Sequence, residues 1–449
     1  ITIGSDNEIY IVGEFRGKFR YNTDSLVSFD QLDVLIAKVD SSGNFQWATS
    51  ATGWGYESAY DISLSPNGNL LVTGYYENNL DFGSFSLTAN NLRDVFIMAL
   101  DQQGNPLWLE SLSGPGVEYG RSIATDTSNN IYLTGVFRDF LYPNGGTLAG
   151  FGSYDAFLAK YDATGQLLWI KAMGGPSADE GYYVNVDNKQ DIVLVGWYDR
   201  SMRIDTLILN GSKEEDGFAA KFAPNGDLIW GIPLAGSFDE RVYAVDFDQN
   251  DDIYLLGTVD SLLVIEGDSL TNRHLNRPTD IFVIKLDSDA NYKWGQTLGH
   301  YYNDFCYDLV VQDPTTLYVV GSFQDTSIFV NDTLISEVGY DIFLGKFNID
   351  TTVSIRQIPN QLLSDIAQIK LYPNPAFKGK STLEYTLTQE TDVVISVYDL
   401  LGQEVYKKIL KNQPVGIHQA TIQLPKAAAI YFVRLGTQNG VQTIELVRP

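Results

Sequence analysis

The chain alternates apolar and polar positions in short runs from residue 1 to about residue 350. Runs such as AYDISLS and DVFIMALD place every second side chain on one face, and turns of Gly, Asn, Asp and Pro separate them. A period of two is typical of β-strands, and no stretch of these residues has the period of an amphipathic helix. The pattern therefore predicts an all-β fold.

The strand pattern recurs at a fixed spacing of 61 residues, with a last step of 64. The recurring residues are a glycine (Gly13, Gly74, Gly135, Gly196, Gly257, Gly321), an aspartate (Asp33, Asp94, Asp155, Asp216, Asp280, Asp341) and a tryptophan (Trp47, Trp108, Trp169, Trp230, Trp294). Each repeat holds four predicted strands, and a repeated four-stranded antiparallel sheet is the blade of a β-propeller. We predict a six-bladed β-propeller over residues 1–358, with residues 351–358 as its last strand. Seven blades is the alternative, if an N-terminal blade is missing.

Each repeat carries large aromatic residues at the same positions, and we expect them to pack between adjacent blades rather than to bind a ligand. Besides the tryptophans, the phenylalanines of this pattern are Phe96, Phe157, Phe218, Phe282 and Phe343.

A second domain follows the repeats. After a polar linker at residues 359–368, residues 369–449 again alternate in strands of five to eight residues between Gly, Asn and Pro turns. This pattern predicts a small Ig-like β-sandwich. Nine Lys and Arg against six Asp and Glu give this domain a net charge of +3, which leaves −29 for residues 1–368.

The repeats resemble the secreted bacterial β-propeller repeat family, whose units read like DIYVTGxF followed by GxxDxFVAKYDxxGNxLW. This chain departs from that pattern at Leu35, Ala99 and Val259. The family has no single enzymatic activity, so the resemblance implies a fold and not a chemistry.

The tail resembles the type-A C-terminal sorting domain of the type IX secretion system, found in Bacteroidetes. The motif positions are Leu371, Tyr372, Pro373, Asn374, Pro375, Asp399, Gly402, Gly416 and Tyr431, and Ala429 stands where glycine is usual. The resemblance implies export through the periplasm to the cell surface or the medium, after a signal peptide has been removed. Its implied partners are the outer-membrane shuttle barrel and the translocon, and cleavage or retention of the tail stays open.

The overall charge of −26 argues against nucleic acid and anionic lipid as partners, because both are bound by clustered Lys and Arg. The single cysteine, Cys306, excludes an internal disulfide. No apolar run approaches the ~20 residues that span a bilayer, so we expect a protein that does not cross the membrane.

One acidic residue per repeat precedes the first strand of the following repeat: Glu57, Glu118, Asp179, Glu240 and Asp304. These acids either ring a central channel as a cation or ligand site, or accept backbone N–H groups at the blade junctions; their symmetry favours the second interpretation. The neighbouring loops are rich in tyrosine, and Tyr56, Tyr119 and Tyr301 are candidates for contact with a carbohydrate or a surface protein.

Two weaker patterns concern calcium and glycans. Residues 246–252, DFDQNDD, have oxygen ligands at alternate positions but lack the glycine and final glutamate of an EF-hand, so we predict no cofactor, with calcium as a weak alternative. Asp-Ser/Thr-aliphatic tripeptides resemble the Bacteroidetes O-glycosylation signal, although Asp-Ser also forms turns. The candidate acceptors are Ser25, Thr206, Ser261, Ser269 and Thr333.

No asymmetric catalytic cluster stands out. The three histidines, His274, His300 and His418, are scattered, and no Gly-rich phosphate loop joins a strand to a helix. We therefore expect a non-catalytic surface or secreted binding and adhesion module. The alternatives are a glycan-acting hydrolase that uses two of the repeated carboxylates, and a structural subunit of a surface filament.

Overall fold

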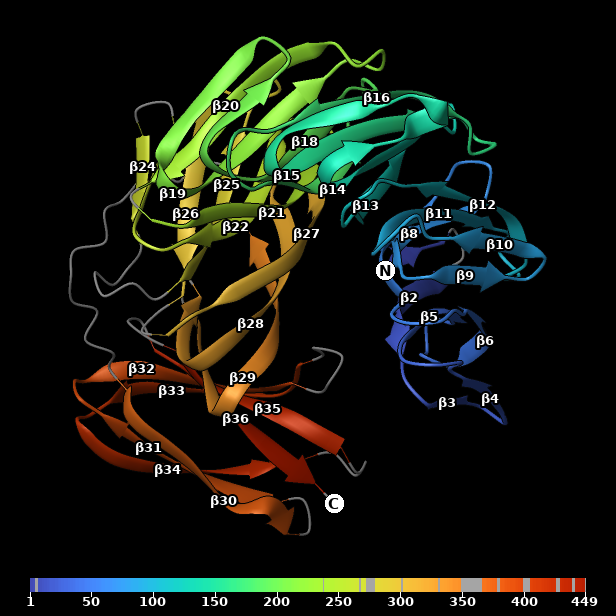
Figure 1. The fold of residues 1–449 in the computed structure, drawn as a ribbon. Coiled ribbons are helices and arrows are strands. Elements are labelled where there is room, and N and C mark those ends of the chain that lie inside the picture. The colour runs from blue at the N-terminus through green and yellow to red at the C-terminus, as the bar shows by residue number, and fades with distance from the viewer. Residues whose placement is uncertain are drawn as a thin grey trace. The chain divides into compact units, whose positions relative to one another are not determined.

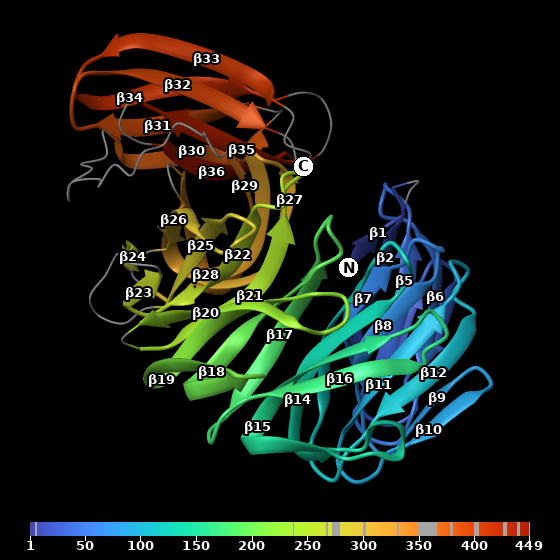
Figure 2. The ribbon, with the colours of Figure 1, turned by 90° about the horizontal axis from the view of Figure 1, so that it is seen from above.

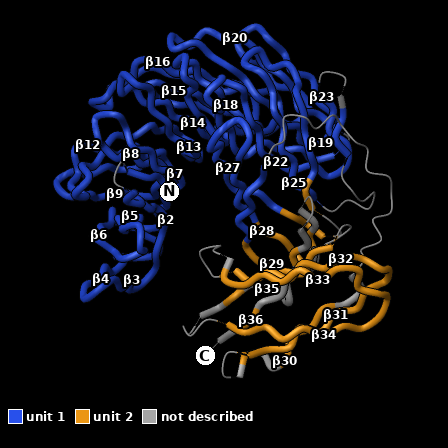
Figure 3. The backbone as a smooth tube through the Cα atoms, turned by 180° about the vertical axis from the view of Figure 1, so that it is seen from behind, with its two compact units in different colours: residues 1–297, 305–321, 343–350 blue, residues 298–304, 322–342, 351–449 orange. Residues whose placement is uncertain are grey.

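The computed structural model describes residues 1–4, 7–236, 238–265, 268–271, 279–299, 302–329, 332–348, 366–377, 380–398, 404–424, 429–437 and 441–448. These residues form 36 strands, and their only helical element is a 3₁₀ turn at Pro143–Gly145. The all-β prediction is confirmed. The chain divides into two compact units (Figure 3): unit 1 is residues 1–297, 305–321 and 343–350, and unit 2 is residues 298–304, 322–342 and 351–449.

Unit 1 is a series of antiparallel sheets in chain order (Figure 1), and the first three each have four strands. Sheet one contains β1 (Thr2–Ile3), β2 (Ile9–Phe15), β5 (Asp33–Val39) and β6 (Phe45–Ala51). Sheet two contains β7 (Ser58–Leu64), β8 (Leu70–Tyr76), β11 (Asp94–Leu100) and β12 (Pro106–Leu112). Sheet three contains β13 (Tyr119–Thr125), β14 (Ile131–Leu141), β15 (Leu148–Tyr161) and β16 (Leu167–Met173). Two separate hairpins accompany them: β3 (Lys18–Tyr21) with β4 (Asp24–Val27), and β9 (Asn79–Phe82) with β10 (Phe85–Thr88).

Sheets four to six continue the series. Sheet four contains β17 (Asp179–Val186), β18 (Ile192–Ile204), β19 (Leu207–Phe222) and β20 (Leu228–Gly236), and it is extended by β23 (Leu262–Ile265) and β24 (Asp268–Thr271). Sheet five contains β21 (Glu240–Phe247), β22 (Ile253–Val259), β25 (Asp280–Leu286) and β26 (Tyr292–Leu298). Sheet six contains β27 (Phe305–Asp313), β28 (Thr316–Phe329) and β29 (Asp332–Asn348), and the parts of β28 and β29 within residues 322–342 belong to unit 2. The predicted last strand, residues 351–358, lies outside the described residues.

Each sheet packs face to face on the next, and the first strands of successive sheets are neighbours (Figure 2). We call the face that contacts the following sheet the forward face and the opposite one the backward face. Between sheets one and two, for example, Val34 and Ile36 of the forward face share one buried cluster with Val72 and Phe96 of the backward face. The repeated phenylalanines lie in these interfaces, fully buried in sheets two to five, as at Phe96. Burial of both faces explains why the central strands are continuously apolar.

In sheets one to four, the repeated tryptophan joins its sheet to the turn of the next one. The indole Nε1 of Trp47 donates to the carbonyl oxygen of Gln102 at 3.0 Å, and its ring lies against Gly104 in the same turn. Gly104 has a φ of +84°, a conformation that a glycine adopts without strain. The same bond recurs from Trp108 to Ala163, from Trp169 to Pro224 and from Trp230 to Ser288. The recurrent Asp-to-Gly turn and tryptophan are therefore two halves of one inter-sheet joint.

The sheets do not close into a ring, which differs from the predicted closed propeller. The forward face of sheet six and the backward face of sheet one are both uncovered. Leu344 on sheet six is 75% exposed, whereas its counterparts Ile97 and Leu158 are fully buried. On sheet one, Ile11 and Leu35 are partly exposed where the other sheets bury the same positions. Leu35 also stands where the following sheets carry phenylalanine.

A lysine in the third strand is buried near an acid in sheets three to five. A tyrosine completes the group in sheets three and five, whereas Val193 stands at that position in sheet four. Lys285 Nζ lies 3.0 Å from Asp248 Oδ2 and 2.8 Å from Asp252 Oδ2, and 4.8 Å from the ring centroid of Tyr254. Lys221 makes the corresponding pair with Asp187 at 2.7 Å. A buried ammonium without a partner is costly, so these residues depend on one another.

Sheet two replaces this buried polar group as a whole. Its equivalent positions carry Ser65, Leu71 and Ala99, so the acid, the tyrosine and the lysine have all been lost together. Leu71 and Ala99 pack in an apolar cluster with Leu133 of sheet three.

Unit 2 contains two sheets in residues 366–448. One is formed by β30 (Ile366–Phe377), β31 (Lys380–Leu387) and β34 (Gly416–Gln423). The other is formed by β33 (Glu404–Gln413), β32 (Thr391–Tyr398), β35 (Ala429–Gly436) and β36 (Val441–Arg448). Side chains of both sheets share one core, which includes Leu383 and Ile422 from the first and Ile395 and Val433 from the second. The alternation read from residues 369–449 thus produces a two-layered β-sandwich.

We predict that Lys285→Met lowers the free energy of unfolding by about 3 kcal/mol or more, because it leaves the Asp248 carboxylate buried without its ion-pair partner. Urea denaturation followed by tryptophan fluorescence measures this in unit 1 alone, since all seven tryptophans lie between residues 47 and 294.

The matched control gives sheet five the residues that sheet two carries at the three equivalent positions. The triple variant Asp248→Ser, Tyr254→Leu, Lys285→Ala removes the whole polar group, and we expect it to be more stable than Lys285→Met. A triple variant that is less stable than the single one would contradict the interdependence.

Candidate functional site

Four of the first strands carry a β-bulge at the same position. The register shifts between Ala59 and Asp61 in β7, and at the equivalent points of β13, β17 and β21. The extra residue at each bulge is Tyr60, Arg121, Tyr182 or Tyr243. A bulge redirects the side chain of its extra residue out of the regular alternation. Because the first strands are neighbours, the four redirected side chains come together.

These residues and three of their neighbours form what we call the tyrosine–arginine cluster. It consists of Tyr60, Tyr75, Arg93, Tyr119, Arg121, Tyr182 and Tyr243. The guanidinium carbon of Arg121 lies 4.9 Å from the ring centroid of Tyr60, 5.3 Å from that of Tyr119 and 5.7 Å from that of Tyr182. Tyr182 and Tyr243 meet edge to face with their centroids 4.8 Å apart. The rings thus extend across four successive sheets.

Each arginine in or beside the cluster is paired with a glutamate. Arg93 Nε lies 2.8 Å from Glu77 Oε1, and its Nη1 donates to the hydroxyl of Tyr119 at 2.5 Å. Arg121 donates to Glu180 of the next sheet.

A third pair extends the cluster toward sheet five. Arg241 donates to Glu215 and lies over the ring of Trp197, 5.1 Å from its centroid. Each of the three arginines thus has one glutamate partner, and the three pairs together have no formal net charge.

The cluster is partly exposed to solvent, although Tyr75 is buried. Tyr60 is 41% exposed and the Arg121 side chain is 26% exposed. Burial raises the pKa of both Tyr75 and Tyr182 to about 12, so both phenols are uncharged at neutral pH. The arrangement offers aromatic faces beside charge-assisted donors and acceptors, a combination that suits recognition and lacks an evident nucleophile.

The predicted column of acids is buried and paired. Glu57, Glu118, Asp179 and Glu240 are fully buried, so they are not exposed at a rim. Each lies beside the aspartate that opens the third strand of the preceding sheet; Glu57 and Asp33 share a hydrogen bond. That aspartate also accepts the backbone N–H of Phe29 at 2.6 Å, which fixes the loop before β5. Asp304 is buried as well.

Burial is the largest cause of the raised pKa of these acids, and the charge of the neighbouring aspartate adds to it. The pKa of Glu57 and of Glu118 rises to about 9, and burial raises that of Asp179 to about 8. At neutral pH these acids therefore keep their protons, which lets Glu57 donate to Asp33 and Glu118 to Asp94. Their position at the entry to each first strand favours a structural role, and ligand binding by these acids stays a prediction.

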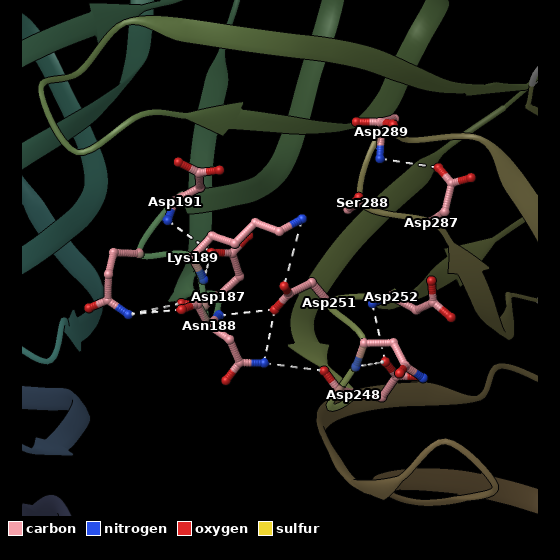
Figure 4. Close-up of polar contacts among 12 residues, drawn as sticks. Asp187, Asn188, Lys189, Asp191, Asp248, Asp251, Asp252, Asp287, Ser288 and Asp289 are labelled. Atoms are coloured by element: carbon pink, nitrogen blue, oxygen red, sulfur yellow. Dashed lines mark hydrogen bonds and ion pairs between the residues drawn. The ribbon is translucent and has the colours of Figure 1, made fainter.

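The candidate calcium segment is engaged by a lysine and by backbone N–H groups. Asp248 Oδ1 accepts the N–H of Asn250 at 2.8 Å, and its Oδ2 faces Lys285. Figure 4 shows Asp248, Asp251 and Asp252 beside the turn that holds Asn188. Asp251 Oδ1 accepts Asn188 Nδ2 of the neighbouring sheet at 2.9 Å, which links the two turns. The described residues contain no group of three or more His, Cys, Asp or Glu side chains placed to hold a metal ion. These carboxylates thus have protein partners that account for their positions.

The other predicted residues fall in several places. Tyr119 belongs to the cluster, Tyr56 is exposed outside it, and Tyr301 lies outside the described residues. Among the glycan acceptors, Ser25, Thr206 and Ser269 are exposed, Ser261 is half-buried, and the side chain of Thr333 is not described.

In the tail, Tyr372 is exposed and its hydroxyl donates to Glu384 at 3.0 Å, whereas Tyr431 is buried in the core. The pairing of β30 with β31 shifts between Tyr372 and Phe377, where the YPNP motif interrupts the ladder. Leu371 is half-buried, and Gly416 opens β34 with a φ of +129°. The side chains of Pro373, Asn374 and Pro375, together with Asp399 and Gly402, lie outside the described part.

The sequence analysis missed Tyr60, Arg121, Tyr182 and Tyr243. A signal was present, because each lies three residues after an acid of the repeated column, and Tyr307 follows Asp304 in the same way. Four of these five positions are tyrosine, and Arg121 alone breaks the pattern.

Residues 370–447 match the family described as the secretion system C-terminal sorting domain. The tail is a type IX sorting domain. This confirms the prediction for the tail, and the protein is exported to the cell surface or the extracellular space. No match to the secreted bacterial β-propeller repeat family accompanies it, so that resemblance stays a prediction. Within the described residues, no helix is long and apolar enough to span a membrane.

Other likenesses are distant. An uncharacterised WD repeat-containing protein of Acanthamoeba polyphaga mimivirus is 21% identical over 408 residues, covering 74% of this chain and 29% of the relative. The chain thus spans less than a third of that relative's length. A Synechocystis apocarotenoid oxygenase is 13% identical with a TM-score of 0.38, covering 94% of both chains. A family 43 arabinoxylan arabinofuranohydrolase of Bacillus subtilis is 11% identical with a TM-score of 0.28, covering 86% of this chain and 95% of that one.

We predict that the acid pairs make unit 1 more stable in mild acid than in mild alkali. In the unfolded chain Glu118 ionises near its ordinary pKa of 4.5, whereas in the fold it keeps its proton up to about pH 9. Its contribution to stability is therefore complete below pH 4.5 and declines as the pH rises toward 9. Glu118→Gln removes this titration while keeping an N–H donor for Asp94.

The free energy of unfolding of Glu118→Gln should consequently fall less between pH 5 and pH 9 than that of the unsubstituted protein. Even a quarter of the pKa shift, at about 1.4 kcal/mol per unit, gives a difference above ~1 kcal/mol. Urea titrations at the two pH values, read by tryptophan fluorescence, measure it. The exposed Glu14→Gln is the control, and equal slopes for Glu118→Gln and Glu14→Gln would refute the proton-sharing pair.

Proposed function

We propose that this exported protein is a non-catalytic surface or secreted module that binds a carbohydrate through the tyrosine–arginine cluster. The observation that carries the proposal is the solvent-open group of aromatic rings around Arg121, assembled from four neighbouring sheets. The type IX sorting domain accounts for delivery to the place where such a ligand is met. During export, the proposed partners of this domain are the outer-membrane shuttle barrel and the translocon.

The chemistry of the cluster fits sugar recognition. Tyrosine gives a large, rigid surface with a polar edge at a small entropic cost, and it is enriched with arginine where binding energy concentrates. Tyr60 and Tyr182 present faces on either side of Arg121, while the paired Glu180 supplies an acceptor. A pyranose ring has both apolar faces and hydroxyl edges, which correspond to these two kinds of group.

The position of the carboxyl pairs supports a binding role over the hydrolase alternative. A general acid must reach the glycosidic oxygen within hydrogen-bond distance. Glu118 and Glu240, the acids on which that alternative depends, are fully buried. Each is also engaged beside its own aspartate, an arrangement repeated from sheet to sheet. O-glycosylation at the exposed acceptors, including Ser25 and Thr206, is part of the same proposal of a surface protein.

Capture on immobilised polysaccharides tests the binding function. We expect the full-length protein to be retained by at least one member of a panel of neutral, acidic and basic polysaccharides. Tyr60→Ala and Tyr182→Ala should each weaken that binding about 10-fold or more, since loss of a central aromatic contact exceeds about 1.4 kcal/mol. Tyr142→Ala is the matched control, because Tyr142 is likewise 41% exposed but lies outside the cluster. Retention unchanged by both cluster variants, or no retention at all, would refute the proposal.

We also propose that the sheets close as a six-bladed ring when the forward face of sheet six meets the backward face of sheet one. The two uncovered faces are the two halves of the interface that joins every other neighbouring pair. Leu344 is the counterpart of Ile36 on a forward face, and Ile11 is the counterpart of Val72 on a backward face. Two faces of one chain also meet at a high effective concentration.

Crosslinking distinguishes ring closure from assembly of copies. In a Cys306→Ser background, Leu344→Cys with Ile11→Cys should give an intramolecular product with a short bismaleimide, as judged by mass and gel mobility. Each single-cysteine variant is the control. Products that contain two or more chains would instead favour the filament alternative, because head-to-tail contacts that do not close form fibres.

A further inference from the structure

We infer that the ligand of the tyrosine–arginine cluster is an uncharged sugar chain rather than an acidic or a basic one. The inference rests on the proposed function and narrows it to a ligand class. It follows from the charge balance of the cluster, from the hydrogen-bonding groups that the cluster leaves open, and from the charge of the surface around it.

The cluster carries little net charge although it is rich in charged groups. Arg93 is bonded to Glu77, Arg121 to Glu180 and Arg241 to Glu215, so each guanidinium has its own carboxylate. The phenols between them are uncharged, as the raised pKa of Tyr182 requires. An acidic ligand that approached Arg121 would therefore meet Glu180 as well.

Arg121 keeps donors available for a neutral partner. Its one hydrogen bond runs from Nε to Glu180 Oε1, which leaves the two terminal nitrogens free to donate. Glu180 stands beside it with acceptor oxygens. A pair of adjacent sugar hydroxyls can accept from a guanidinium and donate to a carboxylate at the same time, whereas a carboxylate ligand can only accept.

The surrounding charge disfavours an anionic ligand, and Arg121 disfavours a cationic one. Residues 1–368 carry a net charge of −29, so a polyanion is repelled before it reaches the cluster. A cationic ligand would seek the faces of aromatic rings, but at Tyr60, Tyr119 and Tyr182 it would lie beside the guanidinium of Arg121 and be repelled by it. A neutral chain meets neither repulsion, and it can stack on the exposed part of Tyr60.

Two pairs of probes that differ only in charge test the inference on the full-length protein. Polygalacturonate is compared with its carboxyl-reduced form, and chitosan oligomers with their fully N-acetylated counterparts, by affinity electrophoresis or calorimetry. We expect the neutral member of at least one pair to bind at least about 10-fold more tightly than its charged partner. Its affinity should change less than about 2-fold between low and high salt, because no net charge is neutralised.

Variants at the ion pair identify the groups involved. Arg121→Gln should weaken binding of the neutral chain about 10-fold, since the shorter amide does not replace the guanidinium donors and Glu180 loses its ion-pair partner. Glu180→Gln removes the repelling carboxylate, and tighter binding of polygalacturonate by this variant is expected if Glu180 excludes acids. Tryptophan fluorescence and urea denaturation confirm that both variants are folded.

The outcomes separate the inference from the proposed function. Preference for polygalacturonate or chitosan that is lost in Tyr60→Ala would overturn the neutral-ligand inference while leaving carbohydrate binding in place. Binding of neither member of either pair, with no retention by any polysaccharide of the wider panel, would overturn both.

Discussion

The structure of the repeats depends on one contact, the packing of the forward face of each sheet on the backward face of the next. A four-stranded sheet with continuously apolar central strands cannot fold alone, because both of its faces must leave water. The buried Phe96 and the bond from Trp47 to Gln102 show how one interface is built, and the later sheets repeat it. Because the two faces of a sheet are different, each contact has a direction, and two unmatched halves remain at the ends of the series.

Buried charged groups inside this packing are held in pairs, as Lys221 and Asp187 are in sheet four. The lysine, acid and tyrosine around Lys285 satisfy one another, and sheet two loses the whole set at once. In the acid pairs, a shared proton rather than a lysine offsets the buried negative charge. Glu118 and Asp94 cannot both ionise in a buried site, so the proton stays and the carboxyls hold the loop together.

The acid pairs also place the candidate binding site. Each pair lies at the entry to a first strand, and the bulge follows three residues later, so the buried carboxyl and the exposed ring belong to one repeated element. The scaffold thus supplies a tyrosine at the same point of sheet after sheet. Arg121 changes that series at one position, and the surrounding rings and Glu180 adapt to it. The proposed binding function is inferred from Arg121, because it departs from the repeat. The acids and aromatic residues that recur from sheet to sheet are explained by folding alone.

The strands, the repeat of 61 residues and the sorting tail could be predicted from the sequence, because alternation and spacing are local properties of the chain. The sequence also supplied the aromatic positions that fill the interfaces. It could not decide whether Glu57 and Glu118 are exposed, because burial depends on which loops cover them. The spacing from each acid to the bulged residue was readable, but only the tertiary structure brings Tyr60, Arg121 and Tyr182 together. A bulge reverses the expected direction of a side chain, and neighbouring first strands then join residues that lie 61 positions apart.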